Sequence, residues 1–192
     1  MTTKLAFVLV PLLATSALAG DDTKNDTKKK AEEAMPKAPA EIGDRVKAMA
    51  GTWKCDGKAS GMDGKQVAFK GSMTTKADLD GYWVHDSFAG TMGEGKMAMQ
   101  FKFESYSTYD ASSKKWRTLF VDNMGGSMSG MADPMKDGKM ESAGEMMGPM
   151  GKSQFKDHTD VSDMKKGAHM WGEMSNDTGK TWKPVYDMTC KK

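Results

Sequence analysis

The chain has 192 residues, of which 28 are basic and 26 acidic, and charges of both signs are interspersed along the sequence. A near-neutral chain without a basic patch argues against nucleic acid as a partner. The length fits one domain with a tail.

The first residues have the pattern of an export signal. Lys4 supplies a positive start, an apolar run over 5–13 is too short to span a bilayer, and Ala17-Leu18-Ala19 is a small-residue cleavage site. We therefore expect 1–19 to be a signal peptide and the protein to be periplasmic or secreted. No later segment is apolar enough to cross a membrane as a helix, so we expect no membrane insertion.

The next segment, 20–40, is rich in charged residues and proline and has almost nothing apolar to bury, which predicts a disordered linker. Ile42, Val46 and Met49 then recur at helical spacing. This spacing predicts one short helix across an end of the domain, which we place at 41–192.

Short stretches of alternating apolar and polar residues follow, separated by turns such as Asp63-Gly64, Asp80-Gly81 and Asp137-Gly138. So many tight turns without a crossover helix predict an all-β fold, an antiparallel up-and-down β-barrel of about ten strands. The strands are expected near 52–59, 65–78, 81–91, 96–109, 115–123, 126–132, 138–147, 152–161, 166–175 and 181–190.

The two cysteines, Cys55 and Cys190, lie in the first and last predicted strands. These strands are neighbours in a closed up-and-down barrel. By strand alternation Cys55 shares the face of Trp53 and Cys190 shares the face of Trp182, so both thiols can point the same way. In an exported chain this arrangement predicts a disulfide across the closing seam, with two unpaired buried thiols as the alternative.

Strand alternation predicts which residues line the interior. Alternation is clearest over 96–103, and its loss at Ser105-Tyr106 predicts a bulge. The expected lumen residues are Trp53, Tyr82, Val84, Met97, Met99, Phe101, Phe103, Trp116, Phe120, Met128, Met140, Phe155, Met170, Trp182 and Tyr186.

Methionine is unusually common, with 20 residues in the chain, eight of them within 124–150. Methionine can replace leucine as a core residue, which explains most of these positions. Thioethers can also bind Cu(I) or Ag(I), because soft sulfur suits a soft ion. Four methionines could share one strand face and are the candidate metal ligands: Met124, Met128, Met140 and Met146.

No motif commits the chain to a reaction. His85, His158 and His169 lie on three different predicted strands without metal-ligand spacing, which argues against zinc and leaves a single histidine in the lumen as a possible haem ligand. Carboxylate pairs such as Asp157 and Asp160 are interpreted as solvated, and no G-x-S-x-G motif occurs. We therefore expect neither an enzyme nor a required cofactor.

The segment Ser175-Asn176-Asp177-Thr178-Gly179-Lys180-Thr181-Trp182 matches the Asp-box pattern S-x-D-x-G-x-T-W. In the families that carry it, this box folds as a β-hairpin whose Asp bonds the turn backbone. The match favours a structural hairpin at the end of the chain.

Gly51-Thr52-Trp53 after a short helix is similar to the opening of calycin barrels, which include lipocalins, fatty-acid-binding proteins and nitrobindins. Tyr109-Asp110, Lys115-Trp116, Val121-Asp122-Asn123-Met124 and the Asp-box resemble a family of exported bacterial proteins of unknown function with calycin-like barrels. The resemblance covers roughly 41–190 and implies a lumen without naming a substrate. The last strand lacks the histidine that binds haem in nitrobindins, and the 61–64 turn replaces the helix pair of fatty-acid-binding proteins.

The sequence thus predicts a monomeric, exported, non-catalytic barrel that holds a small, largely apolar ligand. A Cu(I)- or Ag(I)-binding protein, and an envelope protein with a filled core that serves a structural or interaction role, are the alternatives.

Overall fold

A computed structural model of the protein describes residues 36–61 and 64–192. The expected signal peptide, 1–19, and most of the expected linker, 20–40, lie outside these ranges. Residues Ala38–Lys192 form one compact unit. Within the described ranges, no helix combines the length and apolar character needed to cross a bilayer.

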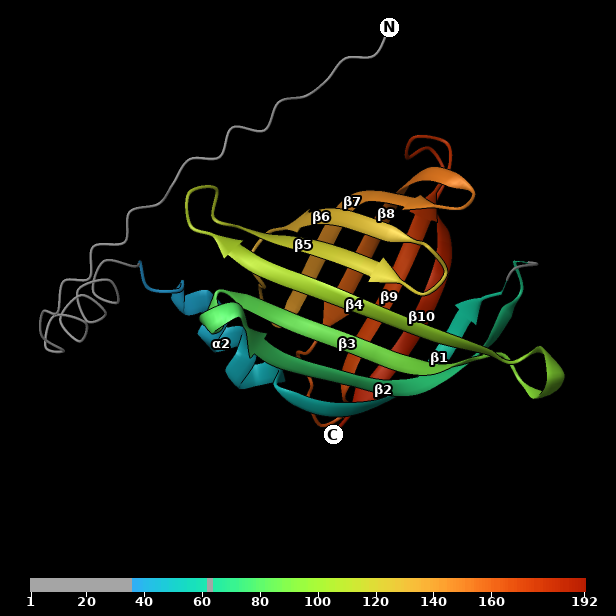
Figure 1. Ribbon diagram of the computed structural model, residues 1–192, viewed down its shortest axis with the longest axis horizontal. Coiled ribbons are helices and arrows are strands. Elements are labelled where there is room, and N and C mark those ends of the chain that lie inside the picture. The colour runs from blue at the N-terminus through green and yellow to red at the C-terminus, as the bar shows by residue number, and fades with distance from the viewer. Residues whose placement is uncertain (1–35, 62–63) are drawn as a thin grey trace, which may run out of the picture. The chain divides into compact units, whose positions relative to one another are not determined.

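Ten antiparallel strands form a closed barrel in which each strand pairs with the next and the last pairs with the first (Figure 1). This confirms the predicted up-and-down topology and strand number. The strands are β1 (Gly51–Ser60), β2 (Gln66–Asp78), β3 (Trp83–Met92), β4 (Met99–Asp110), β5 (Lys115–Asp122), β6 (Ser127–Ala132), β7 (Lys139–Gly148), β8 (Gly151–Asp160), β9 (Ala168–Ser175) and β10 (Lys183–Lys191).

The predicted helix is α2 (Ala40–Met49), which packs against β2, β3 and β4 at one end of the barrel (Figure 1). Ile42 is only 1% exposed and joins a core cluster with Val84, Trp116 and Ala132. The apolar face of α2 therefore covers this end of the barrel, as its helical spacing predicts.

The barrel is joined at its seam by a disulfide. Cys55 on β1 lies directly opposite Cys190 on β10 in the strand register, and their sulfurs are 2.00 Å apart. The predicted pairing of the two cysteines is therefore present in the structure.

Two of the three predicted Asp-Gly turns lie wholly within the described residues, and both have the positive φ values that such turns need. Asp137 and Gly138 have φ values of 52° and 78°, and Lys136 and Lys139 exchange two backbone hydrogen bonds across them. Asp80 and Gly81 also have positive φ, inside the short 3-10 turn η1 (Leu79–Gly81). Asp63 lies outside the described residues.

The predicted bulge at Ser105-Tyr106 is wrong. β4 keeps an unbroken register with both β3 and β5 through these residues. Ser105 and Ser107 are buried on the inner face. The apolar pattern is lost there because the interior itself becomes polar, and not because the strand changes phase.

A register shift does occur in β10, between Pro184 and Tyr186. A bulge of this kind puts successive residues out of their alternating phase. The bulge places Tyr186 on the inner face. Trp182 lies instead under the ammonium of Lys156. Lys156 faces outward, because its neighbours on β8, Phe155 and Asp157, both line the cavity. The predicted lumen position of Trp182 is thereby corrected.

The Asp-box forms the turn between β9 and β10. The carboxylate of Asp177 accepts hydrogen bonds from the backbone N–H groups of Lys180 and Thr181 and from the hydroxyls of Thr181 and Ser175. These bonds, led by the one from the Thr181 hydroxyl, lower the pKa of Asp177 to about 2. The box therefore has the structural role that its pattern predicts.

Candidate functional site: the barrel cavity

The barrel encloses a cavity of about 700 Å³. At one end its lining reaches Arg45 and Met49 of α2. At the other end it reaches the β5–β6, β7–β8 and β9–β10 turns, where Gly126, Pro149 and Asn176 lie. The cavity thus runs from the helix toward the open end of the barrel, which we call the mouth.

Aromatic and methionine residues make up about half of the residues that line it. Phe103 stacks on Phe88 with ring centres 5.4 Å apart and contacts Phe120 at 5.1 Å. Glycine makes room for such rings, because a Cβ at Gly172 would collide with the rings of Tyr186 and Phe155.

Eight of the fifteen predicted lumen residues line this cavity. Seven of them face inward from strands with an unbroken register, and Tyr186 faces inward from β10 after the register shift. They are Phe101, Phe103, Phe120, Met128, Met140, Phe155, Met170 and Tyr186.

Three more, Trp53, Val84 and Trp116, are buried inside the barrel but away from the cavity surface. Trp53 donates its indole N–H to the carbonyl of Met49 at 2.8 Å, so it packs beneath the helix. Val84 and Trp116 belong to the cluster around Ile42. These side chains fill the barrel at the end covered by α2 and close the cavity there.

The remaining predicted lumen residues lie elsewhere. Met99 packs against the core cluster without lining the cavity, and Tyr82 follows η1 before β3 begins. Met97 belongs to the turn η2 (Gly95–Met97), where its side chain is outside the described part of the structure. Trp182 lies on the outer face. Three of the fifteen residues, Tyr82, Met99 and Trp182, are therefore away from the cavity surface, and the side chain of a fourth, Met97, is not described.

Sequence reasoning missed a polar group at the helix end of the cavity. Arg45 lies 3.7 Å from the carboxylate of Asp86, which also accepts a hydrogen bond of 2.5 Å from the hydroxyl of Thr75. The guanidinium lies over the ring of Trp116 at 4.8 Å, and its Nη1 is buried without a hydrogen-bond partner among the described residues. A signal was available, since Arg45 shares the helical face of Ile42 and Met49.

A second carboxyl group, Asp157 of β8, lines the cavity and accepts a hydrogen bond from the hydroxyl of Tyr186. Burial raises the pKa of Asp157 to about 6, even though the bond from Tyr186 opposes the shift. Burial also raises the pKa of Tyr186 well above its usual value. The interpretation of Asp157 as a solvated residue is wrong, because it shares the inner face of Phe155.

Hydroxyl groups complete this polar region. Ser107 and Thr118 face each other across β4 and β5 with their oxygens 2.9 Å apart, and Ser105 precedes them on β4. Ser142 pairs in register with Asp157 across β7 and β8. The cavity therefore has an apolar part with a polar group set into its walls near α2.

The four candidate metal ligands all line the cavity but do not lie together. Met128 and Met146 are opposite each other across β6 and β7, and Met124 lies in the turn before β6. Met140 is six residues from Met146 along β7, about 20 Å at the usual rise per residue. Met140 cannot share one ion with the other three.

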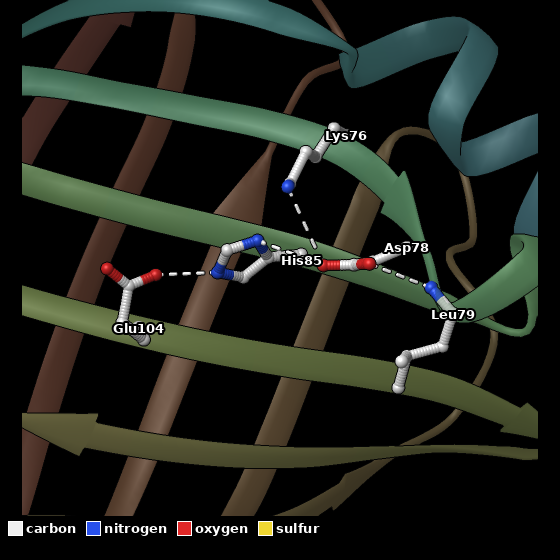
Figure 2. A network of polar contacts seen from close by, with 5 residues as sticks. All are labelled: Lys76, Asp78, Leu79, His85 and Glu104. Atoms are coloured by element: carbon white, nitrogen blue, oxygen red, sulfur yellow. Dashed lines mark hydrogen bonds and ion pairs between the residues drawn. The ribbon is translucent and has the colours of Figure 1, made fainter.

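All three histidines lie on the outer wall, which corrects the possibility of a histidine haem ligand inside the lumen. Figure 2 shows His85 between two carboxylates, with Glu104 at 2.6 Å and Asp78 at 3.4 Å. Asp78 also accepts a hydrogen bond from the backbone N–H of Leu79, which is the main cause of its lowered pKa. The network ties β2, η1, β3 and β4 together on the outside.

His158 and His169 form a similar arrangement over β8 and β9, where both rings stack on Trp171 with centres 4.7 Å apart. Glu141 and Glu173 flank His158. Across residues 36–61 and 64–192, no three histidine, cysteine or acidic side chains gather in a way that could hold a metal ion. These outer groups strengthen strand contacts and lie away from the cavity.

The fold and its interior define a class: closed antiparallel barrels with a ligand-sized cavity, covered at one end by a helix. The family model "Protein of unknown function (DUF1579)" matches residues 39–192, and the chain belongs to this family. The match starts beside α2 and covers every strand, in agreement with the resemblance to a barrel family of unknown function. Comparison with curated proteins gives no match.

Proposed function

We propose that the protein is an exported, non-catalytic barrel that binds a small, largely apolar molecule in its cavity. The observation that carries this proposal is the cavity itself, whose volume of about 700 Å³ lies within the range of small-molecule sites. Phenylalanine and methionine walls supply the hydrophobic contact that such a ligand needs, and export rests on the signal-peptide pattern and on the disulfide.

A cavity of this size argues against the filled core that a structural or interaction protein would have. Packed protein interiors leave few voids larger than a water molecule. Nor do we assign a catalytic role to the groups near Arg45, where Thr75 and Tyr186 donate hydrogen bonds to the carboxyl groups of Asp86 and Asp157.

The test uses N-phenyl-1-naphthylamine, a neutral apolar dye whose fluorescence rises in a dry cavity. Met146 and Met147 are adjacent on β7, but Met146 lines the cavity whereas Met147 is 51% exposed outside. The substitution Met146→Trp should narrow the cavity and weaken dye binding roughly tenfold, about 1.4 kcal/mol.

Met147→Trp adds the same side chain to the outer face and should leave dye affinity unchanged. The proposal fails if the wild-type barrel takes up no dye, or if both variants weaken binding equally, since binding would then be outside the cavity.

One observation favours a second candidate, a soft-metal carrier. Met124, Met128 and Met146 reach the cavity from neighbouring elements near the mouth, and three thioethers suit Cu(I).

This candidate is tested by Cu(I) competition against a chromogenic chelator. Replacing Met128 and Met146 together by leucine should abolish Cu(I) uptake, whereas the same replacement of Met131 and Met147, on the outer face of the same two strands, should not. Equal Cu(I) affinity of the two double variants would exclude this site.

A further inference from the structure

The polar end of the cavity has a surplus of negative charge. Its charged groups are Arg45 from α2, Asp86 from β3 and Asp157 from β8. Lys152, a further basic residue among the lining, lies beside the mouth and is paired with Glu145 at 2.6 Å. With both carboxyl groups ionised, two negative charges are therefore opposed by one guanidinium.

The single positive charge belongs mainly to Asp86. Arg45 and Asp86 are 3.7 Å apart, and Arg45 is further held over Trp116. Asp157, on the opposite part of the wall, has the hydroxyl of Tyr186 as its hydrogen-bond partner. A hydrogen bond from a neutral hydroxyl does not neutralise a buried carboxylate, so Asp157 lacks a matched cation.

From this arrangement we infer that the ligand is an amphipathic cation: an apolar body in the phenylalanine and methionine part of the cavity, and an ammonium or similar group paired with Asp157. This inference rests on the proposed binding function and adds the charge of the ligand. The aromatic walls are consistent with it, because ring faces attract cations. The unpaired Nη1 of Arg45 can donate to a neutral oxygen on the same ligand.

Binding of such a cation depends on pH. The pKa of Asp157, about 6, is set by burial, which raises it, by Tyr186, His158 and Arg45, which lower it, and by Asp86, which raises it slightly. Above pH 6 the carboxylate is charged and can pair with an ammonium group. Below pH 6 it takes up a proton, and the ion pair is lost.

The experiment compares three probes that share one tail: decylamine, decanol and decanoate, each displacing N-phenyl-1-naphthylamine from the full chain at pH 7.5. Decylamine should bind about tenfold more tightly than decanol. A hydrogen bond between charged groups is stronger than one between neutral groups by a free energy that corresponds to about this ratio of affinities. Decanoate should bind more weakly than decanol, because its carboxylate would face a net negative site.

Asp157→Asn keeps the shape and the acceptor for Tyr186 but removes the charge. It should bring decylamine to the affinity of decanol, and a cooperative unfolding transition in urea shows that the variant is folded. Asp86→Asn frees Arg45 and should raise the affinity for decanoate.

A second measurement uses the wild-type protein alone. At pH 5 the ratio of its affinity for decylamine to its affinity for decanol should fall from about ten toward one. The inference is overturned if decylamine binds no better than decanol at pH 7.5, or if decanoate binds best. In either case dye and decanol binding would still support an apolar cavity, whereas failure of all the probes would remove the proposed function itself.

Discussion

A carboxyl group facing an apolar cavity destabilises the folded state in its charged form, because water would solvate that charge better than the protein does. Asp157 is such a group. Its neighbours in β8, Lys156 and His158, are directed outward, so this strand presents polar side chains to the outer wall and to the cavity at alternate residues.

The first prediction concerns Asp157→Asn in the absence of ligand. The folded-state pKa of about 6 exceeds the usual pKa of an aspartate, 3.8, so the native state binds more protons between these two pH values. The stability contributed by the protonated form is present below pH 3.8 and is lost as pH rises through 6. At pH 7.5 the variant should be more stable than wild type by up to about 3 kcal/mol, and near pH 3.5 the difference should vanish. Urea unfolding at several pH values measures this difference.

Asp160, three residues further along β8, provides a control of opposite sign. Its carboxylate accepts hydrogen bonds from the hydroxyl and backbone N–H of Ser162, which lower its pKa. Asp160→Asn should therefore reduce stability at pH 7.5. If both variants were destabilised alike, the assignment of Asp157 as an unfavourable buried charge would be wrong.

At the scale of single elements, the strands could be predicted because their turns and their alternation agree. β3 was expected at 81–91 and occupies Trp83–Met92, and β7 was expected at 138–147 and occupies Lys139–Gly148. The turns Asp80-Gly81 and Asp137-Gly138 require positive φ, which Asp and Gly tolerate. Local chemistry therefore determines where each strand ends.

The apolar part of the site could be predicted by the same alternation, but its polar part could not. Alternation assigns apolar residues to the interior, so the sequence predicts a bulge at Ser105-Tyr106 and a solvated Asp157, although Ser105 and Asp157 keep the inner phase. Arg45 comes from a helix outside the sheet, and its position depends on how α2 docks. In β10 the bulge reverses the phase, and a single sequence does not reveal it.

At the scale of the whole molecule, the cavity depends on closure of the barrel. The seam between β1 and β10 is one of ten strand pairings, and three residues next to it, Ala59, Tyr186 and Met188, line the cavity. Opening of this seam would separate part of the wall from the rest, so the bond between Cys55 and Cys190 bears on binding as well as on stability.

The last prediction is the effect of removing this bond. The disulfide closes a loop of 135 residues, for which the chain-entropy model gives a stabilisation of at most about 5 kcal/mol. The double variant Cys55→Ala/Cys190→Ala should lose a large part of this free energy of unfolding in urea, and its affinity for N-phenyl-1-naphthylamine should fall because the seam opens more often.

Dithiothreitol provides the control, since it should destabilise the wild-type protein and leave the double variant unchanged. A loss of stability below about 1 kcal/mol would mean that the strand pairing alone holds the barrel closed. Loss of stability without loss of dye affinity would mean that opening of the β1–β10 seam does not limit retention of the ligand, since every strand of the barrel contributes residues to the cavity wall.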